Sequence, residues 1–381
     1  MRERSERAAP RPEPGWDGWM AGELDAIRAQ RRWRSTRCLD ALGPVGDLDG
    51  QHVVSFASND YLGLSAHPSV IAAAQEALGR WGTGATASRL VVGERPVHGR
   101  LEADLAEWKG AERAVVFPSG YAANLGVVTA LAGPGTTVLS DELNHASIVD
   151  ACRLSRAEVG VYRHLDLDHL ADRMAMARGR VLVVTDSVFS MDGDVAPLDG
   201  LVALCRDRGA LLVVDEAHAV LGPHLEPGTP GVVQVGTLSK TLGSLGGWVA
   251  GEGPLVDLLV NRARTFIFTT GLSPADAAAA RAALRILRSA EGDALLARLR
   301  AVVDRVRPGN PSPIVPVVLG DEDVALKASA ALLDAGLLVP AIRPPTVPPG
   351  TSRLRVALSA AHDEAMVDQL TTALAALGLW P

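Results

Sequence analysis

The stretch LLVVDEAHAVLGPHLEPGTPGVVQVGTLSK, residues 211–240, contains two short apolar runs that each lead into residues able to do chemistry. Leu211–Val214 is followed directly by Asp215, and Val232–Val235 leads through a glycine turn to Lys240. Both runs are continuous and rich in β-branched residues, which is typical of strands buried on both faces of a parallel sheet. Because such sheets bind ligands at the carboxyl ends of their strands, we expect Asp215 and Lys240 to face a common site.

The same pattern extends in both directions from this stretch. From about residue 53, short apolar runs alternate with helical patterns, and glycine and proline separate them. The further strands that the sequence predicts are Arg113–Phe117, Thr137–Leu139, Val159–Tyr162, Val181–Thr185 and Trp248–Gly251. The alternation predicts an α/β fold in which a large domain holds a mostly parallel sheet, with its strands buried on both faces.

The two ends of the chain differ from this central region. Residues 1–15 are rich in Arg, Glu and Pro and are expected to be unstructured, and a helix begins near Trp16. Beyond Pro274, helical patterns and further strands predict a smaller α+β domain. Its predicted strands are Ile314–Leu319, Leu338–Ile342 and Arg353–Ser359. We therefore expect an N-terminal arm and helix (1–55), a large domain (56–275) and a small C-terminal domain (276–381).

Composition and charge limit the class of function. The chain has 381 residues, of which 37 are basic and 44 acidic, so the surplus of base that a nucleic-acid binder needs is missing. The apolar runs are far too short to span a membrane. Three separated cysteines without a CxxC motif predict neither disulfides nor a cysteine zinc site. We expect a cytoplasmic protein without a metal ion.

Lysine is rare in this chain and therefore informative. Only three of the 37 basic residues are lysines, namely Lys109, Lys240 and Lys327. Arginine stays protonated, whereas lysine can lose its proton and form an imine. Lys240 follows a predicted strand in a glycine-rich segment, and Ser239 before it excludes a phosphate-binding P-loop. We predict that Lys240 carries chemistry and that Lys109 and Lys327 are ordinary solvated residues.

Asp215 suggests what Lys240 works with. A carboxylate at the end of a fully apolar strand is costly to bury without a positive partner. That partner could be a metal, with Glu216 and His218 as weak further ligands, or a protonated pyridine nitrogen, and a helix N-cap is the structural alternative. Pyridoxal phosphate needs both a lysine for an imine and a carboxylate at the ring nitrogen, so the pair favours this cofactor. The glycine turn Pro118–Asn124 offers backbone N–H groups for its phosphate.

Two other residues after predicted strands allow two interpretations each. His145 is either a structural cap at a helix start or an aromatic face over a planar cofactor, and Ser190 is by itself only a turn residue. Two other classes of enzyme lack their sequence motifs in this chain. Gly82-Thr83-Gly84 opens no GxGxxG fingerprint for a dinucleotide, and no GxSxG motif supports an α/β-hydrolase.

Six ordered motifs resemble those of the α-oxoamine synthases, which are fold-type-I pyridoxal-phosphate enzymes. The motifs are SNDYLGL (58–64), SGYAAN (119–124), NHAS (144–147), VFSMDGD (188–194), DEAH (215–218) and GTLSK (236–240). The resemblance runs from about residue 20 to the end of the chain. Around Ile342–Pro344 and Arg353–Arg355 the sequence is most similar to members that condense L-alanine with a pimeloyl thioester.

The resemblance implies a role for individual residues, and the catalytic set would be Lys240, His145 and Asp215. Lys240 would carry the imine, Asp215 would pair with the pyridine nitrogen, and His145 would stack on the ring. The other cofactor contacts would come from His218 and Ser190 near the ring hydroxyl and from Gly120, Tyr121 and Thr237 at the phosphate. Thr270 would reach the phosphate from a second subunit, so the active unit would be a homodimer with its active site at the interface.

The resemblance also implies where the substrates bind. Asn59, Arg355 and His145 would bind the amino acid, and Arg34 and Thr346 would line the acyl-substrate site. The alternation in Arg353–Ser359 places both arginines on one face of a half-covered sheet, and we expect Arg353 to be a solvated or packing residue.

The activity implied is a pyridoxal-phosphate-dependent decarboxylative condensation of L-alanine with a pimeloyl thioester of coenzyme A or a carrier protein. One alternative is another α-oxoamine synthase, such as glycine C-acetyltransferase. A second is a catalytically silent subunit of this fold, which the joint presence of Lys240, Asp215 and His145 opposes. The sequence departs from the family at Asp186, where Glu is usual, and at Tyr121, where Phe is usual.

Overall fold

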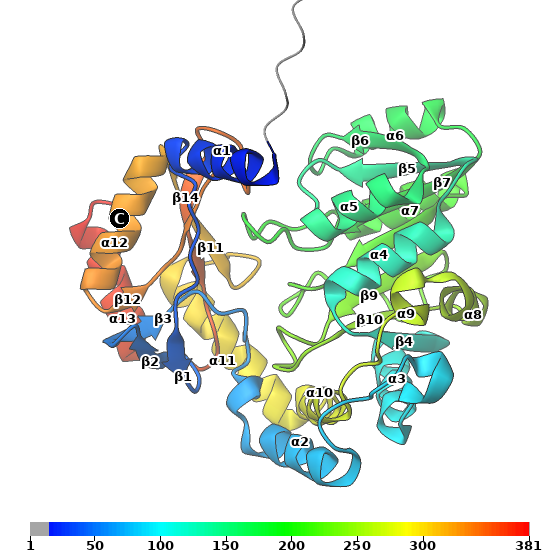
Figure 1. Cartoon of the computed structure of the whole chain (residues 1–381), viewed down its shortest axis with the longest axis horizontal. Helices are drawn as coiled ribbons and strands as arrows, with labels where there is room; N and C mark the ends of the chain where they lie inside the picture. Colours follow the sequence, from blue (N-terminus) through cyan, green and yellow to red (C-terminus); the bar gives the residue numbers. More distant parts are fainter. Residues whose placement is uncertain (1–14, 381) are drawn as a thin grey trace, which may run out of the picture.

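The large sheet has seven strands, and the structure, a computed structural model that describes residues 15–380, places them in one lobe (Figure 1). Their bounds are Arg113–Phe117 (β4), Thr136–Asp141 (β5), Glu158–Tyr162 (β6), Arg180–Asp186 (β7), Leu211–Asp215 (β8), Val232–Thr237 (β9) and Gly247–Gly251 (β10). The strand order is β4-β10-β9-β8-β7-β5-β6. Only β10 runs antiparallel to its neighbours, so the predicted mostly parallel sheet is confirmed.

Helices cover both faces of this sheet because its side chains alternate between two apolar clusters. In β7, Leu182 and Val184 join a cluster with α4, α5, α8 and α9, whereas Val183 joins a cluster with α6 and α7. These helices are Gly120–Leu131 (α4), Ala146–Ser155 (α5), Leu167–Met176 (α6), Leu198–Arg208 (α7), Gly253–Arg262 (α8) and Arg264–Ile267 (α9). The strands that carry the candidate site are thereby fixed from both sides.

One strand of the large sheet differs from the expectation. β6 lies at the edge of the sheet, and its residues Val159 and Val161 are 42% and 51% exposed. The prediction that this strand is buried on both faces is therefore wrong. An edge strand has a neighbour on one side only, and its apolar run by itself does not reveal that position.

The second lobe combines the two ends of the described chain. One of its sheets has the order β11-β14-β13, and the other has the order β1-β2-β3-β12. The strands are Leu39–Ala41 (β1), Val45–Leu48 (β2), Gln51–Ser55 (β3), Ile314–Gly320 (β11), Leu337–Leu338 (β12), Ala341–Ile342 (β13) and Ser352–Ala357 (β14). Because β12 pairs with β3, part of the expected N-terminal arm lies within the C-terminal lobe, and the three-part division stays a prediction.

The single strand expected at Leu338–Ile342 is two short strands, β12 and β13, which belong to different sheets. Pro340 lies between them and has no N–H to donate to a ladder. Helices Ala290–Val306 (α11), Glu322–Asp334 (α12) and Glu364–Ala376 (α13) complete this lobe. Between the two lobes, Pro68–Trp81 (α2) and Pro274–Leu287 (α10) pack together, next to Pro96–Lys109 (α3) (Figure 1).

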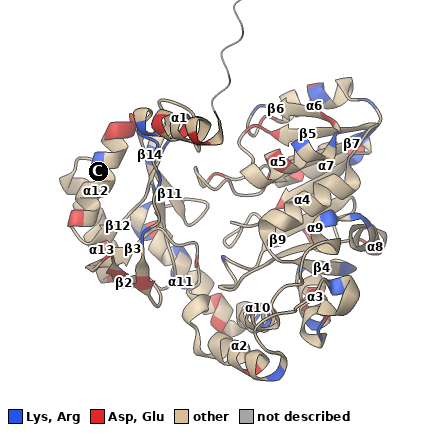
Figure 2. Ribbon diagram, viewed as in Figure 1, with Lys and Arg blue, Asp and Glu red and all other residues tan. Residues whose placement is uncertain are grey.

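The helix expected near Trp16 is present as Trp16–Ala29 (α1), but it buries no residue, and Trp16 is 78% exposed. The expectation that residues 1–15 are unstructured falls almost entirely on residues 1–14, outside the described part of the chain. Within residues 15–380, no helix is both long and apolar enough to cross a membrane. Figure 2 shows basic and acidic residues interspersed over both lobes.

Candidate active site

A cavity of about 230 Å³ lies where the carboxyl ends of β7, β8 and β9 meet the start of α4. Eight of the nine predicted cofactor residues line it, namely Gly120, Tyr121, His145, Ser190, Asp215, His218, Thr237 and Lys240. The ninth, Thr270, is exposed, lies outside this cavity and forms a short bridge with Ser88. The adjacent parallel strands β8 and β9 therefore bring Asp215 and Lys240 to one site, as parallel-sheet geometry predicts.

Asp215 is buried at the end of β8 and is held by two hydrogen bonds. Asn124 Nδ2 donates to Asp215 Oδ2 at 2.6 Å, and the Ala217 N–H donates to Oδ1 at 2.9 Å. In the neighbouring strand, Asp186 stands beside Asp215 in register. Burial, and then the charge of Asp215, raise the pKa of Asp186 well above its ordinary value. This raised pKa disfavours a second negative charge beside Asp215 at this end of the cavity.

Lys240 is held by a neutral histidine. Its Nζ lies 2.8 Å from His218 Nε2, and His218 Nδ1 lies 2.5 Å from the hydroxyl of Tyr61. Burial, and then the charge of Lys240, hold the pKa of His218 well below its ordinary value. Burial also lowers the pKa of Lys240, although Asp215 and Asp186 act in the opposite direction. The lysine is thereby brought closer to the unprotonated form that a base or nucleophile needs.

His145 is the helix cap that one interpretation predicted, and its place over a cofactor ring stays a prediction. It is the N-cap of α5, where its Nδ1 accepts a hydrogen bond from the Ser147 N–H at 3.3 Å. Its own N–H donates to Asp186 Oδ2 at 2.8 Å, and its side chain lines the cavity. Burial is the largest influence on the pKa of His145 and lowers it, so the neutral ring is favoured.

The opposite end of the cavity presents the start of α4. Ser119 caps this helix, because its Oγ accepts a hydrogen bond from the Ala122 N–H at 3.1 Å. The first N–H groups of a helix have no acceptor within it, so those of Gly120 and Tyr121 are suited to an anion. A Cβ on Gly120 would stand 3.3 Å from the Cβ of Thr237, so glycine permits the close approach of turn and strand. A lysine, a carboxylate and an anion cradle in one cavity fit pyridoxal phosphate.

Arg355, on β14, meets the large lobe beside this cavity. Its Nε donates to the Ser190 carbonyl at 2.5 Å, and its Nη2 donates to Asn59 Oδ1 at 3.1 Å. Arg353 is equally buried and pairs with Asp192. The expected half-covered face is therefore wrong, and of the two expectations for Arg353, a solvated or a packing residue, the solvated one is wrong. β14 is the central strand of its sheet, and the loop that carries Ser190 and Asp192 covers the face with both arginines.

A second cavity, of about 750 Å³, adjoins the first at Ser190. Thr346 lines it together with the segment Pro344–Pro349. Arg34, expected beside Thr346, is exposed and does not line this cavity, whereas Arg32 does. The sequence contains no signal that would select Arg32 over Arg34, because both lie in an arginine-rich segment without regular structure.

Some residues of the site carried no role in the sequence analysis. Asn124 hydrogen-bonds to Asp215, and Tyr61 hydrogen-bonds to His218. Two serines, Ser147 and Ser239, line the first cavity. Asn124, Tyr61 and the two serines lie inside the quoted motifs, so motif membership was the one available signal. Among the described residues, no three His, Cys, Asp or Glu side chains are arranged to hold a metal ion.

Lys109 is not the solvated residue that the sequence predicted. It is 9% exposed, its Nζ pairs with Glu216, and it lies 3.8 Å from the ring centroid of Trp108. The prediction fails because Glu216, the residue after Asp215, reaches Lys109 from a distant part of the sequence. This pairing also means that Glu216 is engaged by a cation, whereas the metal alternative needed it as a ligand.

We expect Lys109→Met to lower the free energy of unfolding by about 3–5 kcal/mol, because it leaves the buried Glu216 carboxylate without its partner. Urea unfolding of the cofactor-loaded protein measures this change. Lys327→Met is the matched control, since Lys327 is exposed, and it is expected to change stability by about 0.5 kcal/mol or less. Equal unfolding midpoints for the two variants would show that the buried pair contributes nothing.

The comparisons with known proteins agree with this geometry. Residues 51–374 match the profile of the family described as aminotransferase class I and II. The 8-amino-7-oxononanoate synthase of Anaeromyxobacter dehalogenans is 52% identical, with 94% of this chain and 95% of that protein covered. The enzyme of the same name from Methylobacterium radiotolerans is 50% identical, with coverages of 95% and 98%.

Solved structures give the same result. A serine palmitoyltransferase variant from S. paucimobilis, solved with a bound PLP–myriocin adduct, aligns with a TM-score of 0.86 at 31% identity, over 96% of this chain and 98% of that chain. The 8-amino-7-oxononanoate synthase from Francisella tularensis aligns with a TM-score of 0.71 at 25% identity, over 85% and 96% of the two chains. This chain therefore belongs to the aminotransferase class I and II family and, within it, to the 8-amino-7-oxononanoate synthases.

Proposed function

We propose that this protein condenses L-alanine with a pimeloyl thioester, releases carbon dioxide and the thiol carrier, and forms 8-amino-7-oxononanoate, a step of biotin biosynthesis. The observation that carries the proposal is one cavity that holds Lys240 and Asp215 beside the Arg355–Asn59 pair. Full-length relatives at 52% and 50% identity that bear this enzyme's name support it.

Pyridoxal phosphate, when bound, supplies a protonated pyridine ring that withdraws electrons from the amino-acid Cα. Lys240 would attach it covalently, and Asp215 would keep its ring nitrogen protonated. The neutral ring of His145 would lie against its face, and His218 and Ser190 would lie near its hydroxyl. Gly120, Tyr121 and Thr237 would hold its phosphate at the start of α4.

Lys240 is the base that removes the Cα proton of alanine. Burial lowers the pKa of Lys240. His218 fixes the orientation of the lysine side chain, because Nζ donates a hydrogen bond to the neutral Nε2 at 2.8 Å. Tyr61 in turn holds the other nitrogen of His218. Burial raises the pKa of Tyr61 to about 12, so its phenol keeps its proton throughout the neutral range.

Arg355 and Asn59 are placed to bind the carboxylate of alanine. A guanidinium has five N–H donors, and the contacts with Ser190 and Asn59 leave others for a carboxylate. The second cavity, lined by Thr346 and Arg32 and by apolar side chains such as Phe189 and Met191, would take the acyl thioester. Because Ser190 lines both cavities, the acyl thioester would lie next to the alanine site.

A homodimer fits the exposed residues around Thr270. Leu90, Val91, Val92 and Phe268 are between 53% and 72% exposed, and Thr270 bridges to Ser88 beside them. Exposed apolar patches of this kind mark contact surfaces. A second subunit packed there would bury them and would allow Thr270 to reach a neighbouring phosphate site.

Mass analysis of the product tests the proposal. The purified protein, loaded with pyridoxal phosphate, is expected to convert L-alanine and pimeloyl-CoA into 8-amino-7-oxononanoate with release of carbon dioxide. Glycine with acetyl-CoA, the pair of the alternative within the α-oxoamine synthases, is expected to give little product. Turnover of the glycine pair but not of the alanine pair would show that the proposed substrates are wrong. Turnover of neither pair would favour a catalytically silent subunit.

We expect Arg355→Ala to raise the KM for alanine by roughly 10- to 100-fold, because a charge-assisted carboxylate contact of about 1.5–3 kcal/mol is lost. Arg353→Ala is the matched comparison from the same strand face, and it should act on the KM of the thioester, since Arg353 lines the second cavity. Steady-state kinetics with each substrate varied separately decides. If Arg355→Ala changed only the KM for the thioester, Arg355 would not be the residue that binds the alanine carboxylate.

A further inference from the structure

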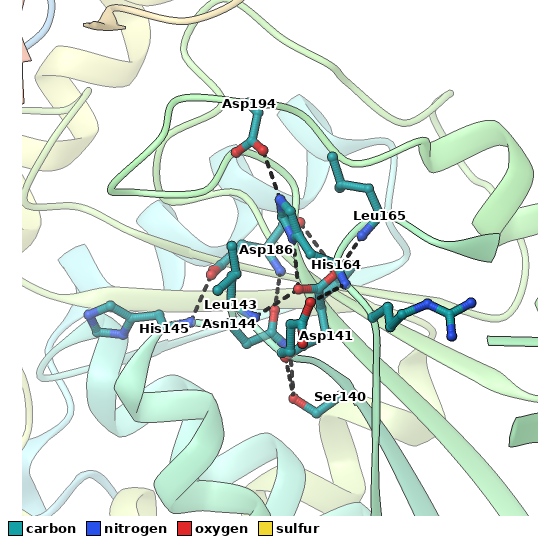
Figure 3. A network of polar contacts seen from close by, with 12 residues as sticks. Ser140, Asp141, Leu143, Asn144, His145, His164, Leu165, Asp186 and Asp194 are labelled. Atoms are coloured by element: carbon teal, nitrogen blue, oxygen red, sulfur yellow. Dashed lines mark hydrogen bonds and ion pairs between the residues drawn. The ribbon is translucent and has the colours of Figure 1, made fainter. Parts of the chain in front are cut away.

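His164 bridges two carboxylates from different segments, and nothing in the sequence analysis assigned it a role. Its Nδ1 lies 2.9 Å from Asp141 Oδ1, and its Nε2 lies 2.7 Å from Asp194 Oδ2 (Figure 3). The side chain of His164 is 17% exposed and that of Asp141 only 1%. Asp141 ends β5, His164 follows β6, and Asp194 lies in the loop after β7, so the bridge joins three segments.

On one side, the bridge leads to the wall of the first cavity. Asp141 also accepts hydrogen bonds from the backbone N–H groups of Leu143 and Leu165 at 2.9 and 3.0 Å. The side-chain oxygen of Asn144, the residue after Leu143, accepts a hydrogen bond from the backbone N–H of Asp186 at 2.9 Å. The backbone N–H of His145 donates to the Asp186 carboxylate (Figure 3). The segment that carries His145 is thereby fixed to β5 and β7.

On the other side, the bridge leads to the loop that separates the two cavities. The Asp194 carbonyl accepts a hydrogen bond from the Phe189 N–H at 3.0 Å, and the ring of His164 meets that of Phe189 edge to face at 4.3 Å. Ser190, next in the loop, accepts from Arg355 through its carbonyl and lines both cavities. His164 and Asp194 themselves line the second cavity.

We propose that His164 is a positioning residue whose bridge between Asp141 and Asp194 fixes the segment carrying His145 against the loop carrying Ser190. The bridge thereby sets the shape of the wall between the cofactor cavity and the acyl cavity. The inference rests on the proposed function only for the identity of the two substrates.

The bridge requires a charged imidazole. Both ring nitrogens face carboxylate oxygens, and a neutral histidine has only one N–H to donate. Burial on its own would lower the pKa of His164, but the hydrogen bonds and charges of Asp141 and Asp194 outweigh burial and raise it to about 10. Glu142 and Asp192 add negative charge around the second cavity, and Arg32 and Arg353 add positive charge.

Because the pKa of His164 is raised, the stability that the bridge contributes depends on pH. Because the folded pKa lies above the unfolded value of about 6.5, the stabilisation is complete below pH ~6.5 and is lost as the pH rises towards 10. In the cofactor-loaded protein, the difference in melting temperature between wild type and His164→Gln should therefore shrink from pH 6.5 to 10. His67→Gln is the matched control, because His67 bridges to a single exposed carboxylate, that of Glu291.

A histidine NMR titration tests the charge directly. In the cofactor-loaded protein, the signal that disappears in His164→Gln should remain that of a charged ring from pH 6 to 9. A midpoint near 6.5 would overturn the proposal. This readout needs no substrate, so it stands even if L-alanine and pimeloyl-CoA give no product, which would refute the proposed function instead.

Kinetics separates positioning from plain structural support. His164→Gln should raise the KM for the thioester by about tenfold, because His164 and Asp194 line the second cavity, and should raise the KM for alanine less, because Arg355 also keeps its contact with Asn59. If His164→Gln does not fold, Asp194→Asn releases only the loop, and its half-exposed position favours folding. The same rise in thioester KM is expected there. Wild-type thioester KM in a folded variant would overturn the proposal.

Discussion

Replacement of Lys240 by alanine is expected to abolish covalent attachment of pyridoxal phosphate and to lower turnover by about 10²–10⁴-fold from loss of the base alone. Lys240 is the one lysine whose Nζ faces the cavity that also holds Asp215, among the lysines of the described chain. Borohydride reduction followed by peptide mass analysis measures the attachment. Wild type should give a single labelled peptide that contains Lys240, and Lys240→Ala should give none.

The control for this experiment follows from the burial of the other lysines. Lys327→Arg alters an exposed residue and should leave labelling and turnover intact. Lys109→Arg is a poorer control, although the sequence predicts a solvated residue there. Lys109 is buried against Glu216, which is one residue from Asp215. A labelled peptide of normal intensity in Lys240→Ala would refute the role of Lys240.

The large sheet could be predicted from local pattern because its strands are short, apolar and separated by glycine or proline. Strand β4 begins and ends where the sequence predicts, and the other strands differ by one or two residues at their ends. Position within a sheet is a different matter, since it depends on which strands become neighbours. The exposure of Val159 in β6 and the division of Leu338–Ile342 between two sheets both come from such long-range pairing.

The candidate site shows the same limit. Asp215 and Lys240 could be predicted to meet because each follows its own strand and parallel strands end at one edge. The partners that decide protonation and burial come from elsewhere in the chain. Glu216 for Lys109, Asp192 for Arg353 and Tyr61 for His218 are separated from their partners by more than 100 residues, and no local pattern indicates them.

Two of the three lysines therefore serve the same short segment in different ways. The residues Asp215–His218 carry Asp215 towards the first cavity, Glu216 towards Lys109, and His218 towards Lys240. Asp215 ends β8, and Ala217 and His218 form a turn, which returns the side chain of His218 to the cavity that Asp215 lines. The rarity of lysine is informative, but it does not by itself separate a chemical role from a structural one.

Replacement of Asp215 by asparagine is expected to weaken cofactor binding and to slow removal of the alanine Cα proton by about two to three orders of magnitude. A neutral amide cannot hold a pyridine nitrogen in its protonated form. Loss of one member of a buried ion pair costs about 3–5 kcal/mol, and each 1.4 kcal/mol corresponds to tenfold. Exchange of the alanine Cα hydrogen for deuterium, followed by NMR in the absence of thioester, measures this step alone.

Asp186→Asn is the matched control for Asp215→Asn, because the two carboxyls stand side by side in register on β7 and β8. Burial and the charge of Asp215 raise the pKa of Asp186 well above its ordinary value, so its negative form is disfavoured and a neutral amide should alter the charge of the site less here than at Asp215. Asparagine also keeps an oxygen to accept the His145 N–H. The exchange rate should therefore fall by less than about tenfold in this variant. Equal losses in both variants would show that the negative charge at Asp215 is not what drives proton removal.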